Sequence, residues 1–194
     1  MTEPRITPLP RSQWDETVTR LLASALPSGS DEPLRIFTTL ARQPDLFRRW
    51  LAFGGALLAG HLPARLRELV ILRTAYRFNG EYEWAQHLSI GAAAGVTHEE
   101  LAALGGDLSA LSWDPLERAA LAAVDETADE GAVGDATWAT LAQHFDEGDL
   151  VELLMLIGHY LMLTTVLRSL RVQLEPAAAE WAGRIPGGPP RSAP

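Results

Sequence analysis

The chain has 194 residues, 47% of them hydrophobic and 21% charged, and its formal net charge is −9 at pH 7. This length and composition are typical of one globular domain that buries its core without disulfides or a structural metal. The acidic balance argues against the basic patch that a nucleic-acid surface needs, so we expect no nucleic-acid partner. Cysteine and lysine are both absent, which excludes thiolate nucleophiles, redox cysteine pairs and lysine Schiff bases.

The N-terminal segment is rich in proline and lacks the charged-then-apolar order of a signal peptide. We interpret residues 1–32 as an arm that carries one short helix at 14–25. The most apolar stretch, residues 150–163, is interrupted by Glu152 and His159. The sequence therefore predicts a cytoplasmic protein with no membrane partner.

From residue 33 onward, apolar residues recur every three or four positions, which is the helical spacing. Pro44 and Pro63 suit first helical turns, Asn79-Gly80 ends a helix, and Thr97 begins a capping box with Glu100. The expected helices cover residues 34–41, 44–58, 64–78, 81–94, a segment from 97, 114–130, 135–142 and 148–172. Alternating strand patterns are nearly missing. We predict an all-α bundle of about eight helices in one domain, residues 33–175, and a disordered tail over residues 176–194.

Glu83 and His87 are the first residues that suggest chemistry. They are four positions apart and therefore share one face of a helix. A carboxylate beside an imidazole orients the ring and raises its basicity, and the ring can then move a proton near neutral pH. Glu68 lies on the preceding predicted helix, and an antiparallel hairpin would bring it to the same pocket. We predict that His87, Glu83 and Glu68 are catalytic.

Two other interpretations of these residues are open at this point. A glutamate and a histidine four apart on an exposed helix face are common, and such a pair contributes roughly a few tenths of a kcal/mol. A metal site formed by Glu68, Glu83, His87 and His159 is the second interpretation, but the HExxH spacing or a comparable ligand pattern is missing. We therefore predict no metal and no other cofactor.

The segment RLRELVILRTAYRFNGEYEWAQHLSIGAAAGVTHEEL resembles the core of the carboxymuconolactone decarboxylase family, whose fold is shared by the AhpD-like alkylhydroperoxidases. The resemblance is close over residues 62–101 and weaker from 36 to 175. In the peroxidase branch it implies a CxxC pair followed by a histidine. Aligned on His87, the two cysteine positions fall on Gly80 and Glu83, and the upstream glutamate falls on Glu68. The resemblance thus implies the decarboxylase-like branch, in which a glutamate and a histidine transfer protons, and the missing thiols exclude peroxidase activity.

Four further residues are candidates for binding a substrate. Tyr82 and Trp84 are predicted to line the pocket with His159, and Arg73 is a candidate partner for a substrate carboxylate. Each also has an ordinary interpretation. Aromatic residues and a histidine on an apolar helix are usual in a core, and arginines at this density usually form surface or subunit ion pairs.

We interpret the chain as a cofactor-free acid/base enzyme, a carboxymuconolactone decarboxylase-like lyase. Its predicted substrate is a small carbonyl- or carboxylate-bearing molecule that is decarboxylated, or in which a lactone or double bond is isomerised. A non-catalytic relative with the same fold is the alternative. Segments 34–58 and 150–170 are apolar over more of their circumference than one small core covers. This pattern and the resemblance predict a homo-oligomer, namely a dimer, a trimer or a hexamer.

Overall fold

Helices form all the regular structure in the residues that the computed structural model describes, which are 3–26, 30–185 and 188–189. The α-helices are α1 (Glu16–Ser24), α2 (Arg35–Leu40), α3 (Pro44–Leu58), α4 (Ala64–Arg77), α5 (Glu81–Ala93), α6 (His98–Leu104), α7 (Pro115–Glu130), α8 (Asp135–Leu141), α9 (Glu147–Leu170) and α10 (Pro176–Arg184). Two short 3₁₀ helices, η1 (Arg11–Gln13) and η2 (Leu108–Ala110), accompany them. The all-α prediction is confirmed, with α10 as the helix that the sequence pattern did not predict.

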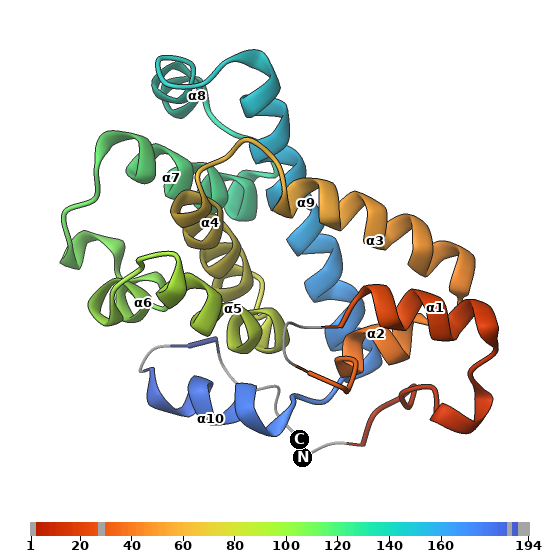
Figure 1. Cartoon of the computed structure of the whole chain (residues 1–194). Helices are drawn as coiled ribbons and strands as arrows, with labels where there is room; N and C mark the ends of the chain where they lie inside the picture. The colour runs from red at the N-terminus through yellow and green to blue at the C-terminus, as the bar shows by residue number, and fades with distance from the viewer. Residues whose placement is uncertain (1–2, 27–29, 186–187, 190–194) are drawn as a thin grey trace.

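α4 lies at the centre of the bundle, and α5, α7 and α9 pack against it (Figure 1). Its residues 69–72 are fully buried, which agrees with apolar residues on every side of the helix. Polar residues on such a helix must find partners inside the protein, because water does not reach them. Glu68, Arg73 and Thr74 are the buried polar residues of α4, and each has such a partner.

The turn between α4 and α5 is closed by two backbone hydrogen bonds. Asn79 adopts a left-handed conformation with φ 60°. Its N–H donates to Tyr76 O at 3.1 Å, and the N–H of Gly80 donates to Ala75 O at 2.6 Å. This pairing is common where a helix ends at a left-handed residue, and asparagine tolerates that conformation better than most residues. The turn folds α5 back along α4, as the Asn79-Gly80 signal predicts.

α10 occupies residues at which we predicted the start of a disordered tail. Pro176 begins the helix, and α10 packs against α5. Trp181 and Ile185 contribute to the core cluster that contains Trp84 and Leu88. This contact joins residues that are far apart in the sequence, and it orders the segment. A local sequence pattern does not reveal such a contact. Residues 186–187 and 190–194 of the predicted tail lie outside the described residues.

α9 has the length and composition of a membrane-spanning helix. Half of its most apolar window is nevertheless buried inside the protein, and the helix packs against α3, α4 and α5. This is the environment of a core helix in a bundle. The cytoplasmic location stays a prediction.

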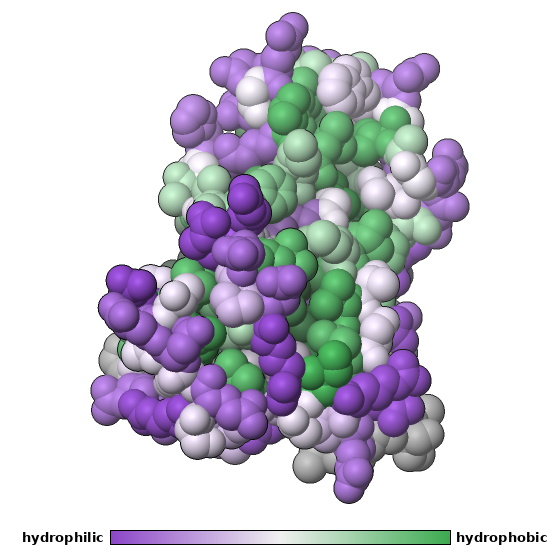
Figure 2. Space-filling view, turned by 90° about the vertical axis from the view of Figure 1, so that its right-hand side faces the viewer, coloured by the Kyte–Doolittle hydropathy of each residue, from purple (hydrophilic) through white to green (hydrophobic). Residues whose placement is uncertain are grey.

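An exposed apolar band lies on α3 and α9. Figure 2 looks onto the side of the molecule where α3 lies and shows apolar side chains running down it. Exposed members of this band are Leu46 and Phe53 from α3 and Val151, Met155 and Met162 from α9. A homo-oligomer would cover such a surface. The oligomer stays a prediction, and sedimentation at micromolar concentration would test it.

Candidate active site

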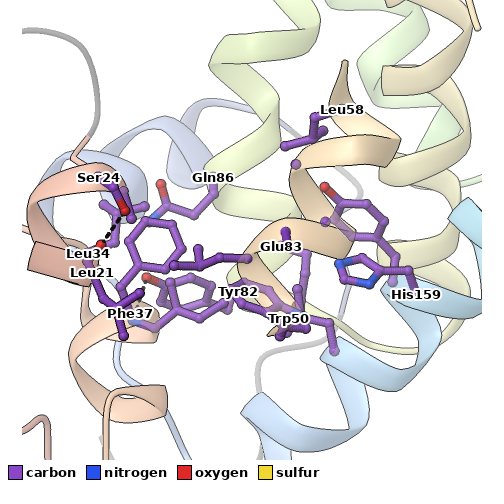
Figure 3. A pocket seen from close by; sticks show the side chains of 18 of the residues that line it. Leu21, Ser24, Leu34, Phe37, Trp50, Leu58, Tyr82, Glu83, Gln86 and His159 are labelled. Atoms are coloured by element: carbon purple, nitrogen blue, oxygen red, sulfur yellow. Dashed lines mark hydrogen bonds between the residues drawn. The ribbon is translucent and has the colours of Figure 1, made fainter. Parts of the chain in front are cut away.

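A cavity of about 650 Å³ lies between α1, α2 and α3 on one side and α5 and α9 on the other. Most of its wall is apolar, with Phe37 and Trp50 as the large aromatic residues. One end is polar, and there α5 contributes Glu83 and His87 while α9 contributes His159 and Tyr160. Figure 3 shows Glu83, Trp50 and His159 around the hollow. The size and the lining suit a small organic ligand.

Both ring nitrogens of His87 have hydrogen-bond partners. Nδ1 lies 2.7 Å from Glu68 Oε2, and Nε2 lies 3.1 Å from the Tyr160 hydroxyl. An ionised carboxylate only accepts hydrogen bonds, so in that state Nδ1 carries the proton and Nε2 accepts one from Tyr160. Glu68 and His87 are buried, at 1% and 9% exposure. The result is a chain of carboxylate, imidazole and phenol that crosses α4, α5 and α9.

Charged groups are unevenly distributed around the hydrogen bonds that join Glu68, His87 and Tyr160. Arg67 Nε lies 3.7 Å from Glu68 Oε1 and places a positive charge on the far side of that carboxylate. Burial raises the pKa of Tyr160 well above its usual range, and the negative charges of Glu68 and Glu83 add to this effect. The phenol is therefore neutral at physiological pH, and it loses its proton only when His87 or a ligand takes it.

Glu83 lies one helical turn before His87 but makes no hydrogen bond to it. Both of its carboxyl oxygens are buried and lack a hydrogen-bond partner within the described residues. Thr164 Oγ1 lies beside this carboxyl, also without a bond of normal geometry. Burial raises the pKa of Glu83 to about 7, and the charges of His87 and Arg168 partly oppose that rise. The carboxylate that orients His87 is therefore Glu68, while Glu83 is an acid that holds its proton up to about neutral pH.

Residues 44–126 match the sequence model of the carboxymuconolactone decarboxylase family. This central segment of the chain is therefore similar to the carboxymuconolactone decarboxylase family. The matched segment contains Glu68, Glu83 and His87, whereas Tyr160 and His159 lie beyond it. No curated protein sequence matches the chain.

Solved structures of low sequence identity share the fold. A peroxidase-related protein from Ralstonia eutropha JMP134, with an alkylhydroperoxidase AhpD core, has a TM-score of 0.77 and 18% identity over 91% of this chain and 96% of its own. A peroxidase-related protein from Silicibacter sp. TM1040 has a TM-score of 0.77 and 15% identity over 94% and 98%. The debrominase Bmp8, as a cysteine-to-alanine variant with 2,3,4-tribromopyrrole, has a TM-score of 0.71 and 20% identity over 93% and 96%. At these identities the likeness shows an AhpD-like fold.

Gly80 stands where the family resemblance places the first cysteine of the peroxidase branch. A Cβ atom at this position would lie 2.5 Å from Thr164 Oγ1 and 2.9 Å from Glu83 Oε2. Real Cβ atoms essentially never approach other atoms so closely. Thr164 Oγ1 and the Glu83 carboxyl therefore occupy the space that a side chain at position 80 would need.

His159 is held between aromatic rings of α3. Its ring stacks on Trp50 with centroids 5.8 Å apart, and Phe53 contacts it edge-on at 5.3 Å. Burial lowers the pKa of His159, so its ring is neutral. Nδ1 is buried without a partner in the described part of the chain, and Nε2 faces Gly54. His159 thus lines the cavity as a neutral, flat, polar group.

Tyr82 also lines the cavity, but its hydroxyl is part of a structural network. The hydroxyl accepts a hydrogen bond from Ile36 N at 3.3 Å and donates one to Glu175 Oε1 at 2.9 Å. Gln86 donates to the other oxygen of Glu175. Burial raises the pKa of Tyr82 well above its usual range. Its ring is the part of the residue that a ligand meets.

The structure does not bring Trp84 and Arg73 to the cavity. Trp84 packs in the second core cluster, with Leu69 and Leu72. Arg73 makes two hydrogen bonds to Asp125, at 2.7 and 2.8 Å, and it also donates to backbone carbonyls. Arg73 follows Glu68 by five residues, which turns it about 140° around α4 and away from the site.

Sequence reasoning missed Tyr160 as a partner of His87. A tyrosine on an apolar helix is usual in a core, and we selected its neighbour His159 as the polar residue of that segment. Adjacent residues on a helix point about 100° apart, so the choice of one does not imply the other. Only the packing of α9 against α5 shows that Tyr160 reaches the imidazole.

Metal ligation is not favoured by the arrangement of side chains. Across residues 3–26, 30–185 and 188–189, no group of three or more histidine, cysteine, aspartate or glutamate side chains could hold an ion. Glu68 and His87 bond to each other, and Glu83 stands apart from both. The cofactor-free interpretation stays a prediction.

Proposed function

We propose that this protein is an acid/base enzyme that moves a proton on a small carbonyl-bearing molecule bound in the cavity. The observation that carries the proposal is His87, which is buried at the polar end of an apolar cavity with Glu68 on one nitrogen and Tyr160 on the other. General acid/base catalysis needs a positioned proton carrier whose pKa suits neutral pH, in a site from which water is excluded.

The geometry suggests how the proton moves. Tyr160 lines the cavity, and its oxygen takes a proton from a carbon beside the ligand carbonyl while its own proton passes to His87 Nε2. Glu68 stabilises the imidazolium that forms, because its carboxylate accepts a hydrogen bond from Nδ1–H at 2.7 Å. Reversal of the transfer returns a proton to the same carbon or to another one. Return to another carbon shifts a double bond, and protonation of a carbanion completes a decarboxylation.

Glu83 is the second acid of the proposed site. It lines the cavity one turn before His87, and its raised pKa of about 7 lets it hold a proton at neutral pH. A neutral carboxyl can donate a hydrogen bond to a carbonyl oxygen, which stabilises the negative charge that develops there. In this proposal Glu83 therefore assists, while His87 and Tyr160 carry the proton.

The family match of residues 44–126 and the fold support the proposal without fixing the reaction. The family is named for a decarboxylase, and the structural neighbour Bmp8 is a debrominase. One fold thus serves several chemistries, and the site must decide among them. The alternative of a non-catalytic relative is tested by the same experiment as the proposal.

Deuterium exchange at the carbon next to a carbonyl tests the proposal directly. Small cyclic ketones and lactones in D₂O are followed by NMR with wild-type protein, His87→Gln and Tyr160→Phe. We expect the wild type to accelerate exchange and His87→Gln to lose about 100-fold or more, because it lacks the proton carrier. The matched control is His98→Gln, the same change at an exposed residue of α6.

Two outcomes would contradict the proposal. The first is no acceleration by wild-type protein with any of these compounds. The second is a His87→Gln variant that melts earlier but exchanges at the wild-type rate, which would make His87 a structural residue. An unmatched hydrogen bond in the core would account for such a loss of stability, at about 1–3 kcal/mol.

A further inference from the structure

We infer that the cavity binds an uncharged, largely apolar ring compound with a single hydrogen-bonding group, and that it discriminates against carboxylates. This inference rests on the proposed function in one respect, which is that both use the same cavity. It narrows the substrate predicted from the sequence, which included carboxylate-bearing molecules.

Charge is the first observation behind this inference. Glu83 is a buried acid at the polar end of the cavity, and a second buried acid, Glu68, lies behind the lining residue His87, 2.7 Å from its Nδ1. Among the described residues that line it, Arg48 is the only cation. Arg48 belongs to α3, its side chain is 55% exposed, and its guanidinium lies 3.9 Å from Asp45. An anionic ligand at the polar end would lose its water beside Glu83, with Glu68 behind His87, and would find no buried cation among the described lining residues.

The hydrogen-bonding groups of the lining are the second observation. The Tyr82 hydroxyl and the Gln86 amide are both used by Glu175, which ties them to the start of α10. The groups left for a ligand are few: the Glu83 carboxyl, the Tyr160–His87 pair, the His159 ring and Nε1 of Trp50. A ligand with many polar groups would lose hydration that this wall does not replace, whereas one carbonyl or hydroxyl finds a partner.

Aromatic rings are the third observation. Trp50 and His159 stack with an interplanar angle of 16°, and Phe37 lies 6.2 Å from Trp50 between ring centroids. Both Trp50 and His159 line the cavity (Figure 3). Flat apolar groups pack favourably against such rings, face to face or edge-on. The volume of about 650 Å³ leaves room for a compound of two fused rings.

A matched pair of probes tests the inference. 2-Naphthol and 2-naphthoate share one ring system, but at pH 7 the first is neutral and the second is an anion. Isothermal titration calorimetry measures both with the wild-type protein. We expect 2-naphthol to bind at least about tenfold more tightly, because buried like charges disfavour the anion. With a pKa of about 7, Glu83 is ionised in about half of the molecules at this pH, so Glu83→Gln should narrow the difference in part.

A blocking variant shows that the probe occupies this cavity. Gly55 lines it, and a Cβ atom there would contact nothing within 4 Å, so Gly55→Phe places a ring at the opening with little strain. Gly158→Phe is the control, since this α9 glycine is equally open but lines a separate hollow of about 370 Å³. We expect only Gly55→Phe to weaken 2-naphthol binding, by at least about tenfold.

The outcomes separate this inference from the proposed function. Equal or tighter binding of 2-naphthoate would overturn the inference, and loss of that binding in Arg48→Ala would identify the residue responsible. Failure of both probes to bind would also overturn it. Selective 2-naphthol binding that persists in His87→Gln supports the inference even if no proton exchange occurs. In that case only the proposed function fails.

Discussion

A buried acid lies at each of two neighbouring turns of α5, Glu68 of α4 at one and Glu83 of α5 itself at the other, and the two acids differ in their surroundings. At the His87 turn, Glu68 lies 2.7 Å from the imidazole and 3.7 Å from Arg67. At the Glu83 turn, a carboxyl of similar burial has no hydrogen bond within the described residues, and its pKa rises to about 7. Burial without a cationic partner raises the pKa of Glu83, whereas Glu68 has Arg67 and His87 close to its carboxyl oxygens. The first arrangement suits a relay, and the second suits a proton donor.

The largest expected effect comes from exchanging each acid for its amide. Glu68→Gln should lower the rate of ligand deuterium exchange about 100-fold, because the imidazolium loses its stabilising charge. Glu83→Gln should lower it about tenfold or less, because an amide still donates a hydrogen bond. Both variants are measured by the same NMR assay. A larger loss with Glu83→Gln would reverse the roles that we assign to the two turns.

Gly80→Ala tests how tightly the Glu83 turn is packed. The new Cβ atom would lie 2.5 Å from Thr164 Oγ1, so the unfolding free energy should fall by about 1–3 kcal/mol. Gly134→Ala is the control, because this glycine is also an N-cap and its Cβ atom would lie 3.5 Å from Glu126. Urea unfolding compares the two. Thr164→Ala in the Gly80→Ala background should restore part of the stability. If it does not, the contact with Thr164 is not the cause of the loss.

The raised pKa of Glu83 predicts how stability depends on pH. The folded protein binds a proton at Glu83 up to about pH 7, whereas an exposed glutamate loses it near 4.5. This contribution is fully present below about pH 4.5 and is lost as the pH rises through 7. Wild type should therefore lose about 1–3 kcal/mol relative to Glu83→Gln between pH 5 and pH 8, measured by urea unfolding at both pH values. Parallel curves for the two proteins would mean that Glu83 is ionised throughout.

Metal removal should have the smallest effect. A bound ion is another way to satisfy the unpartnered oxygens of Glu83, but no cluster of ligands surrounds them in the described residues. Dialysis against a chelator should therefore leave the melting temperature and the exchange rate unchanged. The proton transfer proposed for His87 would be contradicted by a metal that copurifies in stoichiometric amount and whose removal lowers the melting temperature or the exchange rate.

The sequence predicted most of the fold and part of the site. Helical spacing and the signals at Asn79 and Thr97 act locally, and the helices they delimit are present, including the capping box at Thr97. Glu68 was predicted to face the same pocket as His87 because a short turn joins their helices, but Glu83 was predicted to orient the imidazole. Tyr160 and the aromatic wall from α3 depend on contacts across more than 70 residues or between separate elements. Local periodicity carries no information on such contacts. For the same reason the sequence pattern did not predict α10, which packs against the distant α5.

The close packing around Gly80 couples three positions of the chain in evolution. A cysteine at position 80 would meet Thr164 Oγ1 and the carboxyl at 83, and a smaller residue at 83 removes only the second of these contacts. A lineage moving from this chain toward a CxxC pair would therefore gain the cysteine at 80 more easily after changes at 83 and 164. Positions 80, 83 and 164 thus form an epistatic group, in which the effect of each substitution depends on the other two.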